Sequence, residues 1–114
     1  MTRARQALGA AGEDLAATWY EARGYRVLAR NWRCRAGELD LVLRQGTTVV
    51  FCEVKSRSSL AFGSPLEAVT PEKCRRIRRL AAMWLAQAEA GAVELRFDVA
   101  AVLGGRVEVV EAAF

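Results

Sequence analysis

The chain has 114 residues, of which 53% are hydrophobic and 26% are charged, a composition typical of one globular domain rather than of a disordered chain. Its longest apolar run has seven residues, far fewer than the ~20 of a membrane helix, and its N-terminus lacks an apolar signal region. Three cysteines without a CxxC spacing, and no histidine, argue against a Cys/His zinc site. We therefore expect one domain over residues 1–114, cytoplasmic and away from the membrane, with reduced cysteines.

Positive charge is concentrated in the first part of the chain. Residues 1–80 hold 15 basic and 8 acidic side chains, whereas residues 81–114 hold 2 basic and 5 acidic ones. Arginine supplies 15 of the 17 basic residues, and its planar guanidinium favours bidentate contacts with phosphate. This asymmetry fits a nucleic-acid partner, and it fits a solvated basic surface equally well.

The first predicted element is a helix over residues 5–23, because apolar side chains recur there near helical spacing. Gly24 would end this helix. Its expected apolar stripe consists of Leu8, Leu15, Trp19 and Ala22. A loosely alternating strand over residues 25–32 follows, and after it a basic loop over residues 33–37.

Two further strands are predicted over residues 38–45 and 48–56, joined by Gly46 and Thr47. Glycine at the first turn position suits a type II′ hairpin. The strands carry apolar side chains on both faces, so the sheet needs a covering layer on each side. We expect Leu39, Leu41 and Val54 on one face, and Val42, Val49 and Phe51 on the other.

A second helix is expected to begin after Thr70 as N-cap, with Pro71 in its first turn, and to run to about Glu89. Its predicted apolar face consists of Cys74, Ile77, Ala81, Trp84 and Ala88. The last two elements are strands over residues 94–103 and 106–112. The order is therefore αβββαββ, which predicts an α/β sandwich with a helix on each face of the sheet.

Charged side chains interrupt the third predicted strand at Glu53 and Lys55, and a buried charge is costly unless it is paired, hydrogen-bonded or metal-bound. With a two-residue turn, antiparallel pairing places Asp40 opposite Glu53 and Glu38 opposite Lys55. Asp40, Glu53 and Lys55 then share one face, with the two carboxylates on Cβ atoms about 4.5–5.5 Å apart. A divalent cation would relieve their repulsion, and carboxylate oxygens suit Mg²⁺ or Mn²⁺.

The same charges also fit a cross-strand ion network without a metal, formed by Glu38, Asp40, Glu53 and Lys55. Three features favour a site over such a network. The strand around the charges is otherwise apolar, and the charges lie at the strand ends farthest from the turn, where a cleft can open. Basic side chains flank both ends where a phosphate backbone would pass, namely Arg33, Arg35 and Arg57.

The stretch "GELD", followed after twelve residues by "EVK", resembles the PD-(D/E)xK nuclease signature in the form D-x12-E-x-K. More closely, residues 8–114 resemble the YraN-like family of small bacterial proteins. The matching stretches are "GEDLAATWYEARGYRVLARNWRCRAGELDLV", "FCEVKSRSSLAFGSPLEAVTPEKCRRI" and "RFDVAAV". The resemblance implies a restriction-endonuclease-like fold, a mixed central sheet flanked by helices, related to that of archaeal Holliday-junction resolvases.

The resemblance also implies roles for individual residues. Asp40, Glu53 and the carbonyl of Val54 match the ligands of Mg²⁺ or Mn²⁺, and Lys55 matches the catalytic lysine. Glu13 matches a helix-borne glutamate that completes such sites in resolvase-like relatives, and it equally fits a solvent-facing acid in a first helical turn. The implied reaction is metal-assisted hydrolysis of phosphodiester bonds, and the implied assembly is a homodimer.

Five basic residues within seven open the second long helix: Lys73, Arg75, Arg76, Arg78 and Arg79. They fit contacts with a phosphate backbone, without sequence readout, and they also fit a solvated helix face.

Three functions compete on this reading. The first is a divalent-metal-dependent endonuclease acting on DNA, including branched DNA, and the sequence does not separate DNA from RNA. The second is a nucleic-acid-binding module of the same fold without catalysis. The third is a protein-interaction domain whose basic helix meets an acidic partner.

Overall fold

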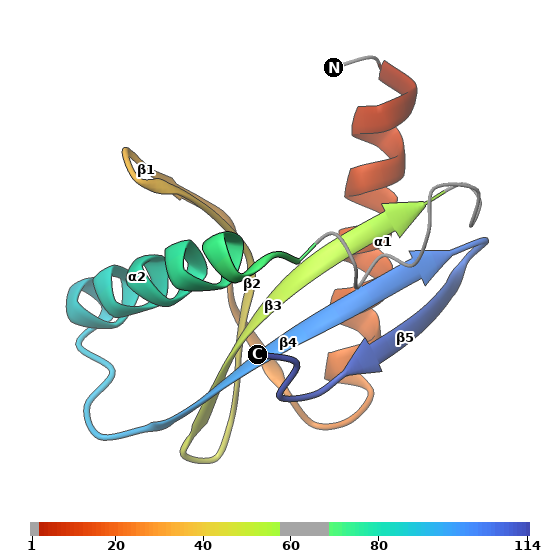
Figure 1. Ribbon diagram of the computed structural model, residues 1–114. Coiled ribbons are helices and arrows are strands. Elements are labelled where there is room, and N and C mark those ends of the chain that lie inside the picture. Colours follow the sequence, from red (N-terminus) through yellow and green to blue (C-terminus); the bar gives the residue numbers. More distant parts are fainter. Residues whose placement is uncertain (1–2, 58–68) are drawn as a thin grey trace.

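The computed structural model describes the backbone of residues 3–57 and 69–114, and side chains from residue 10 onward within these ranges. Two helices and five strands follow one another in the predicted order (Figure 1). They are α1 (Arg3–Glu21), β1 (Arg26–Cys34), β2 (Gly37–Gln45), β3 (Thr48–Arg57), α2 (Pro71–Ala88), β4 (Glu94–Leu103) and β5 (Arg106–Val110). Neither described helix has the length and apolar character needed to cross a membrane.

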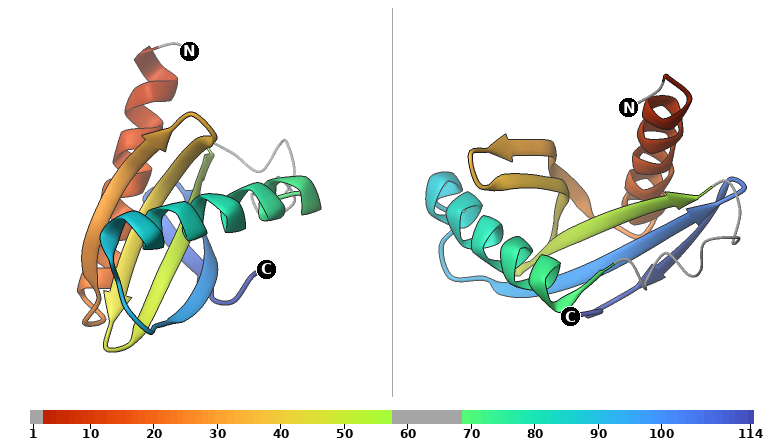
Figure 2. Two further views of the ribbon diagram at one scale, coloured as in Figure 1. Left: turned by 90° about the vertical axis from the view of Figure 1, so that its left-hand side faces the viewer. Right: turned by 45° about the horizontal axis from the view of Figure 1, so that its top comes forward.

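The strands form one mixed sheet in the order β1-β2-β3-β4-β5. Neighbouring strands are antiparallel except β3 and β4, which are parallel. A tight turn is too short to join two parallel strands, so the chain crosses from β3 to β4 through helix α2. The predicted α/β architecture with a mixed sheet and a helix on each face is confirmed (Figure 2).

Local signals in the sequence set the ends of several elements. Thr70 caps α2, since its side chain accepts a hydrogen bond from the backbone N–H of Lys73 at 3.2 Å. The β2–β3 turn has a positive φ of 60° at Gly46, the conformation required at the first position of a type II′ turn. Both predictions are confirmed.

Two apolar clusters fill the space between the sheet and its helices. The cluster under α2 contains Leu39, Val42, Val49, Phe51, Ile77, Leu80, Ala81, Trp84 and Phe97. The cluster under α1 contains Ala16, Ala17, Tyr20, Leu41, Leu43, Val50, Cys52 and Ala100. The expected apolar face of α2 is largely confirmed, but Ala88 is exposed and Leu80 takes a buried place beside Ile77.

The predicted apolar stripe of α1 was wrong. Leu15 and Ala22 are exposed and Trp19 is half-buried, whereas Gly12, Ala16 and Tyr20 face the sheet. Small residues let the helix approach β3 so closely that a Cβ on Gly12 would lie 1.8 Å from the Ser56 hydroxyl. A spacing rule that counts only large apolar residues misses this face. The Leu8 side chain lies outside the described part of the chain.

The basic loop predicted over residues 33–37 is shorter than expected. Strand β1 continues to Cys34 and β2 begins at Gly37, so only two residues form the turn. The β1–β2 hairpin bends away from the sheet toward α2 (Figure 2), and a Cβ on Gly37 would lie 3.3 Å from Leu80. This bend separates Leu39 from Leu41, which were predicted to share a face but pack in opposite clusters.

Candidate metal and phosphate site

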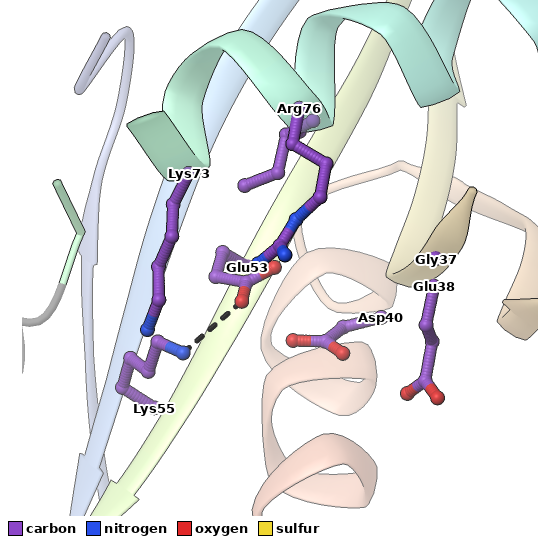
Figure 3. Close-up of a pocket in the computed structure, with 8 residues that line it drawn as sticks. Gly37, Glu38, Asp40, Glu53, Lys55, Lys73 and Arg76 are labelled. Atoms are coloured by element: carbon purple, nitrogen blue, oxygen red, sulfur yellow. Dashed lines mark hydrogen bonds and ion pairs between the residues drawn. The ribbon is translucent and has the colours of Figure 1, made fainter. Parts of the chain in front are cut away.

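A polar cleft of about 370 Å³ opens between the bent β1–β2 hairpin, β3 and the first turns of α2 (Figure 3). Its lining combines three acids and three bases from three different elements. They are Glu38 and Asp40 on β2, Glu53 and Lys55 on β3, and Lys73 and Arg76 on α2, with Gly37 and Ile77 beside them. The structure thus brings together the acidic and basic residues that the strand pattern and the basic run had singled out separately.

The predicted register of β2 against β3 is confirmed from Gln45–Thr48 to Leu41–Cys52. The described pairing ends there, one residue short of Asp40 and Glu53. Instead of continuing the ladder, the Asp40 carboxylate accepts a hydrogen bond from the backbone N–H of Val54 at 2.8 Å. Asp40 and Glu53 therefore lie in the same cleft, as predicted, but not as a directly opposed backbone pair (Figure 3).

The acids of the cleft do not form the single ion network that was the simpler alternative. Lys55 pairs with Glu53 on its own strand at 3.1 Å, and both side chains are less than a fifth exposed. Glu38 pairs with Arg33 across the hairpin at 2.7 Å, not with Lys55. Asp40 is the cleft acid held by a backbone N–H and by no ion pair among the described residues.

Burial and the neighbouring charge of Glu53 raise the pKa of Asp40 to about 7. The hydrogen bond from Val54 and the charge of Lys55 lower this pKa, but they do not offset the first two effects. Near neutral pH a large part of Asp40 is therefore protonated, because its ionised form is desolvated and lies close to the charge of Glu53. A bound cation would favour the ionised form of Asp40 and bring its pKa down.

Glu13 lies on α1 and does not line the cleft. Its carboxylate accepts a hydrogen bond from the Asn31 side-chain amide at 2.7 Å. Partial burial raises the pKa of Glu13, and the charge of Glu13 in turn contributes to the raised pKa of Asp40. Glu13 is therefore an electrostatic neighbour of the cleft and not a solvent-facing acid of a first helical turn.

The donor set of the cleft fits a hard divalent cation. Asp40 and Glu53 offer carboxylate oxygens. Val54 is not among the residues that line the cleft, but its N–H is directed to Asp40, and the N–H and C=O of one residue in an extended strand share an edge, so its carbonyl is expected on the same side. Within residues 3–57 and 69–114, no group of three or more His, Cys, Asp or Glu side chains is arranged around one metal position. A metal here would complete its coordination with water and phosphate oxygens, as Mg²⁺ commonly does.

The predicted phosphate-binding residues divide into two groups. Lys73 and Arg76 lie one helical turn apart on α2 and line the cleft. The others lie outside its lining: Arg33 and Arg35 at the hairpin tip, Arg57 at the end of β3, and Arg75 and Arg79 exposed on α2. Arg78, from the same basic run, stacks on the Phe97 ring at 4.4 Å.

Two polar residues were missed by sequence reasoning. The contact between Asn31 and Glu13 could not be predicted, because an asparagine in a loosely alternating strand is typical of an exposed position. Asp98 is fully buried in β4, and it did carry a signal, since it interrupts an apolar strand as Glu53 does. It accepts hydrogen bonds from Tyr20, Arg96 and the Ala112 backbone, so groups of the fold itself satisfy its carboxylate.

Comparison with known proteins relates the chain to one family. A UPF0102 protein of Beutenbergia cavernae is 62% identical over 104 residues, covering 91% of this chain and 88% of the relative. A UPF0102 protein of Acidothermus cellulolyticus is 48% identical over 126 residues, covering 97% and 96%. The model of the family described as "Uncharacterised protein family UPF0102" matches residues 12–102. The resemblance to the YraN-like family is thereby confirmed, and the chain belongs to the UPF0102 family.

Proposed function

We propose that this protein is a divalent-metal-dependent endonuclease that hydrolyses phosphodiester bonds in DNA. The observation that carries the proposal is the composition of the cleft. A partly buried carboxylate with a raised pKa, a second carboxylate and a lysine lie beside two cations from α2, within one open cavity. A metal and a phosphate group together need this combination, because the acids hold the metal and the bases hold the anion.

In this proposal Asp40, Glu53 and the Val54 carbonyl hold Mg²⁺ or Mn²⁺, and Glu13 holds a water next to them. Such a metal supplies a water of lowered pKa and neutralises charge on the phosphate. Asp40 must be ionised to bind the metal, so cation binding and loss of its proton are coupled. The D-x12-E-x-K spacing of these residues supports the same assignment, as does the relation to PD-(D/E)xK nucleases that it implies.

The bases of the cleft have separate tasks. The Lys55 ammonium, held at 3.1 Å from Glu53, is in place to orient the attacking water and to stabilise the charge that develops on the phosphate. Lys73 and Arg76 bind the phosphate that is cut. Exposed arginines at the hairpin tip and on α2 contact the flanking backbone without reading sequence.

Branched DNA is the substrate that the relation to junction resolvases favours. A four-way junction presents two symmetric scissile phosphates, so a homodimer would place one site on each. RNA offers the same phosphate chemistry, and it belongs in the panel of substrates.

The proposal is tested by incubating labelled four-way junction, flap, duplex and single-stranded DNA, and one RNA, with Mn²⁺, Mg²⁺ or EDTA. We expect metal-dependent cleavage that is lost with EDTA and reduced at least 100-fold in Asp40→Asn and Glu53→Gln. Glu108→Gln removes an exposed acid on β5 and serves as the matched control, with full activity.

Three outcomes would contradict the proposal. Cleavage that is equal in the wild type and in both site variants would come from a contaminating nuclease. Tight binding of DNA with no cutting under any metal would leave a nucleic-acid-binding module, and no salt-dependent DNA binding at all would favour the protein-interaction domain.

A further inference from the structure

Asn31 has an unusual backbone in the middle of β1. Its φ is 49°, in the left-handed region that non-glycine residues seldom adopt and that asparagine tolerates better than most. The residues on either side remain paired with β2, Arg30 opposite Leu41 and Trp32 opposite Leu39. A left-handed residue inside a paired strand costs free energy, so the surrounding fold has to hold it there.

The position opposite Asn31 is occupied by Asp40. In the pairs on both sides of this position, the two residue numbers add to the same value. The register is therefore unbroken here, and it places Asn31 and Asp40 opposite each other across the hairpin. The side chains of β2 change faces at the same point, with Leu39 packing under α2 and Leu41 under α1. The irregular backbone at Asn31 thus coincides with the step that takes Asp40 out of the β2–β3 ladder and turns its carboxylate toward the Val54 N–H.

The side chain of Asn31 points to a second acid. Its amide donates a 2.7 Å hydrogen bond to Glu13 on α1. One residue therefore lies opposite Asp40 in the hairpin register and reaches the helix that carries Glu13 through its side chain.

We infer that Asn31 is the positioning residue of the acidic site: its left-handed backbone places Asp40, and its amide places Glu13. This inference rests on the proposed function only for the statement that the two acids serve a metal. The placement itself follows from the geometry, and it can be measured without metal or DNA.

Three substitutions separate the two tasks. Asn31→Gly keeps the left-handed backbone and removes the amide. Asn31→Val has a similar size but a β-branched side chain that strongly disfavours positive φ. In Asn31→Asp the aspartate still adopts the left-handed backbone, but its carboxylate lies against that of Glu13. Arg30→Gln is the matched control, because it breaks the neighbouring α1–β1 ion pair with Asp14 and leaves residue 31 unchanged.

Placement of Asp40 is read from hydrogen exchange at the Val54 amide, whose acceptor is the Asp40 carboxylate. In metal-free protein we expect Asn31→Val to speed this exchange at least 10-fold relative to neighbouring β3 amides. Asn31→Gly, Asn31→Asp and Arg30→Gln should stay within about threefold of wild type. Unchanged protection of Val54 in a folded Asn31→Val protein would overturn the backbone part of the inference, and faster exchange in Asn31→Gly would overturn it as well.

Placement of Glu13 is read from Mn²⁺ affinity, measured by the electron paramagnetic resonance signal of free Mn²⁺. Loss of a group that orients a metal-site acid typically costs 10- to 100-fold in affinity. We expect about a 10-fold loss in Asn31→Gly, no smaller a loss in Asn31→Asp, and no loss in Arg30→Gln, which only removes a positive charge near Glu13. Equal affinity in Asn31→Gly and wild type would overturn the side-chain part. If wild type itself bound no Mn²⁺, the proposed function and this part would both be wrong, while the Val54 exchange would still decide the backbone part.

Discussion

At the scale of single residues, Asp40 and Asp98 show how differently two acids in apolar strands are used. Asp98 receives hydrogen bonds from Tyr20, from Arg96 and from a backbone N–H, so its charge is balanced by the fold. Asp40 receives one hydrogen bond, from Val54, and lies near a second carboxylate. A fully buried acid with satisfied partners stabilises the structure, whereas a partly buried acid without an ion-pair partner can still bind a cation.

The raised pKa of Asp40 predicts how the stability of the metal-free protein depends on pH. The folded protein binds this proton up to about pH 7, whereas the unfolded chain releases it near pH 4. The free energy of unfolding should therefore fall as pH rises from about 4 to about 7, because the folded state binds more protons in this window. Asp40→Asn should lose this part of the slope and be more stable than wild type at pH 8 by on the order of 2 kcal/mol.

Urea unfolding in EDTA at half-unit steps of pH measures this difference. Glu108→Gln, which removes an exposed acid on β5, is the control and should follow the wild-type profile. Parallel profiles for wild type and Asp40→Asn would show that the pKa of Asp40 is not raised in the folded protein.

At the scale of elements, the site depends on the place where the β1–β2 hairpin, β3 and the start of α2 come together. Strand β3 brings Glu53 and Lys55, the bent hairpin brings Asp40, and the first turns of α2 bring Lys73 and Arg76 (Figure 3). Thr70 and Pro71 fix where α2 begins, and hence which of its basic residues reach the cleft.

This arrangement predicts a difference between basic residues. Arg76→Gln should weaken DNA binding and reduce the slope of log affinity against log salt by about 1, since one phosphate contact is lost. Arg106→Gln, at the start of β5 and outside the cleft lining, should leave the slope unchanged. Fluorescence anisotropy of labelled DNA between 50 and 200 mM salt, roughly the range where such slopes are steep, makes the comparison. Equal slopes for the two variants would remove Arg76 from the phosphate site.

The close approach of α1 to β3 is a second property of elements. In Gly12→Ala the new Cβ would lie 1.8 Å from the Ser56 Oγ and 3.1 Å from its Cβ, so the hydroxyl must rotate away and the helix or the strand must move slightly. We expect a loss of about 1–3 kcal/mol in the free energy of unfolding, despite the better helix propensity of alanine. Ser56→Ala in the same chain removes the closer clash and should restore part of the loss, a coupling that a double-mutant cycle measures. Additive effects of the two changes would show that the helix does not pack on Ser56.

At the scale of the whole molecule, the order of elements could be predicted because its signals are local. The N-cap at Thr70, the turn at Gly46 and the apolar runs of the strands each act within a few residues. The mixed sheet with a helix on each face then follows from covering both of its apolar faces.

Other features could not be read from the sequence. Alternation along a strand assumes a regular ladder, and the left-handed Asn31 breaks that ladder opposite Asp40. Asp40 and Glu53 do line one cleft, as predicted. The prediction that they are directly opposed in the β2–β3 pairing was wrong. The buried face of α1 was missed because close packing on Gly12 and Ala16 depends on the partner strand.

The central claim is that Asp40 and Glu53 form a cation site and not an ion network that is complete without a metal. Titration of the protein with Mn²⁺ near pH 7, the pKa of Asp40, followed by isothermal calorimetry, tests it most directly. We expect binding with protons released in wild type, affinity reduced at least 10-fold in Asp40→Asn and in Glu53→Gln, and wild-type affinity in Glu108→Gln. No Mn²⁺ binding at millimolar concentration, or equal binding in all four proteins, would contradict the account.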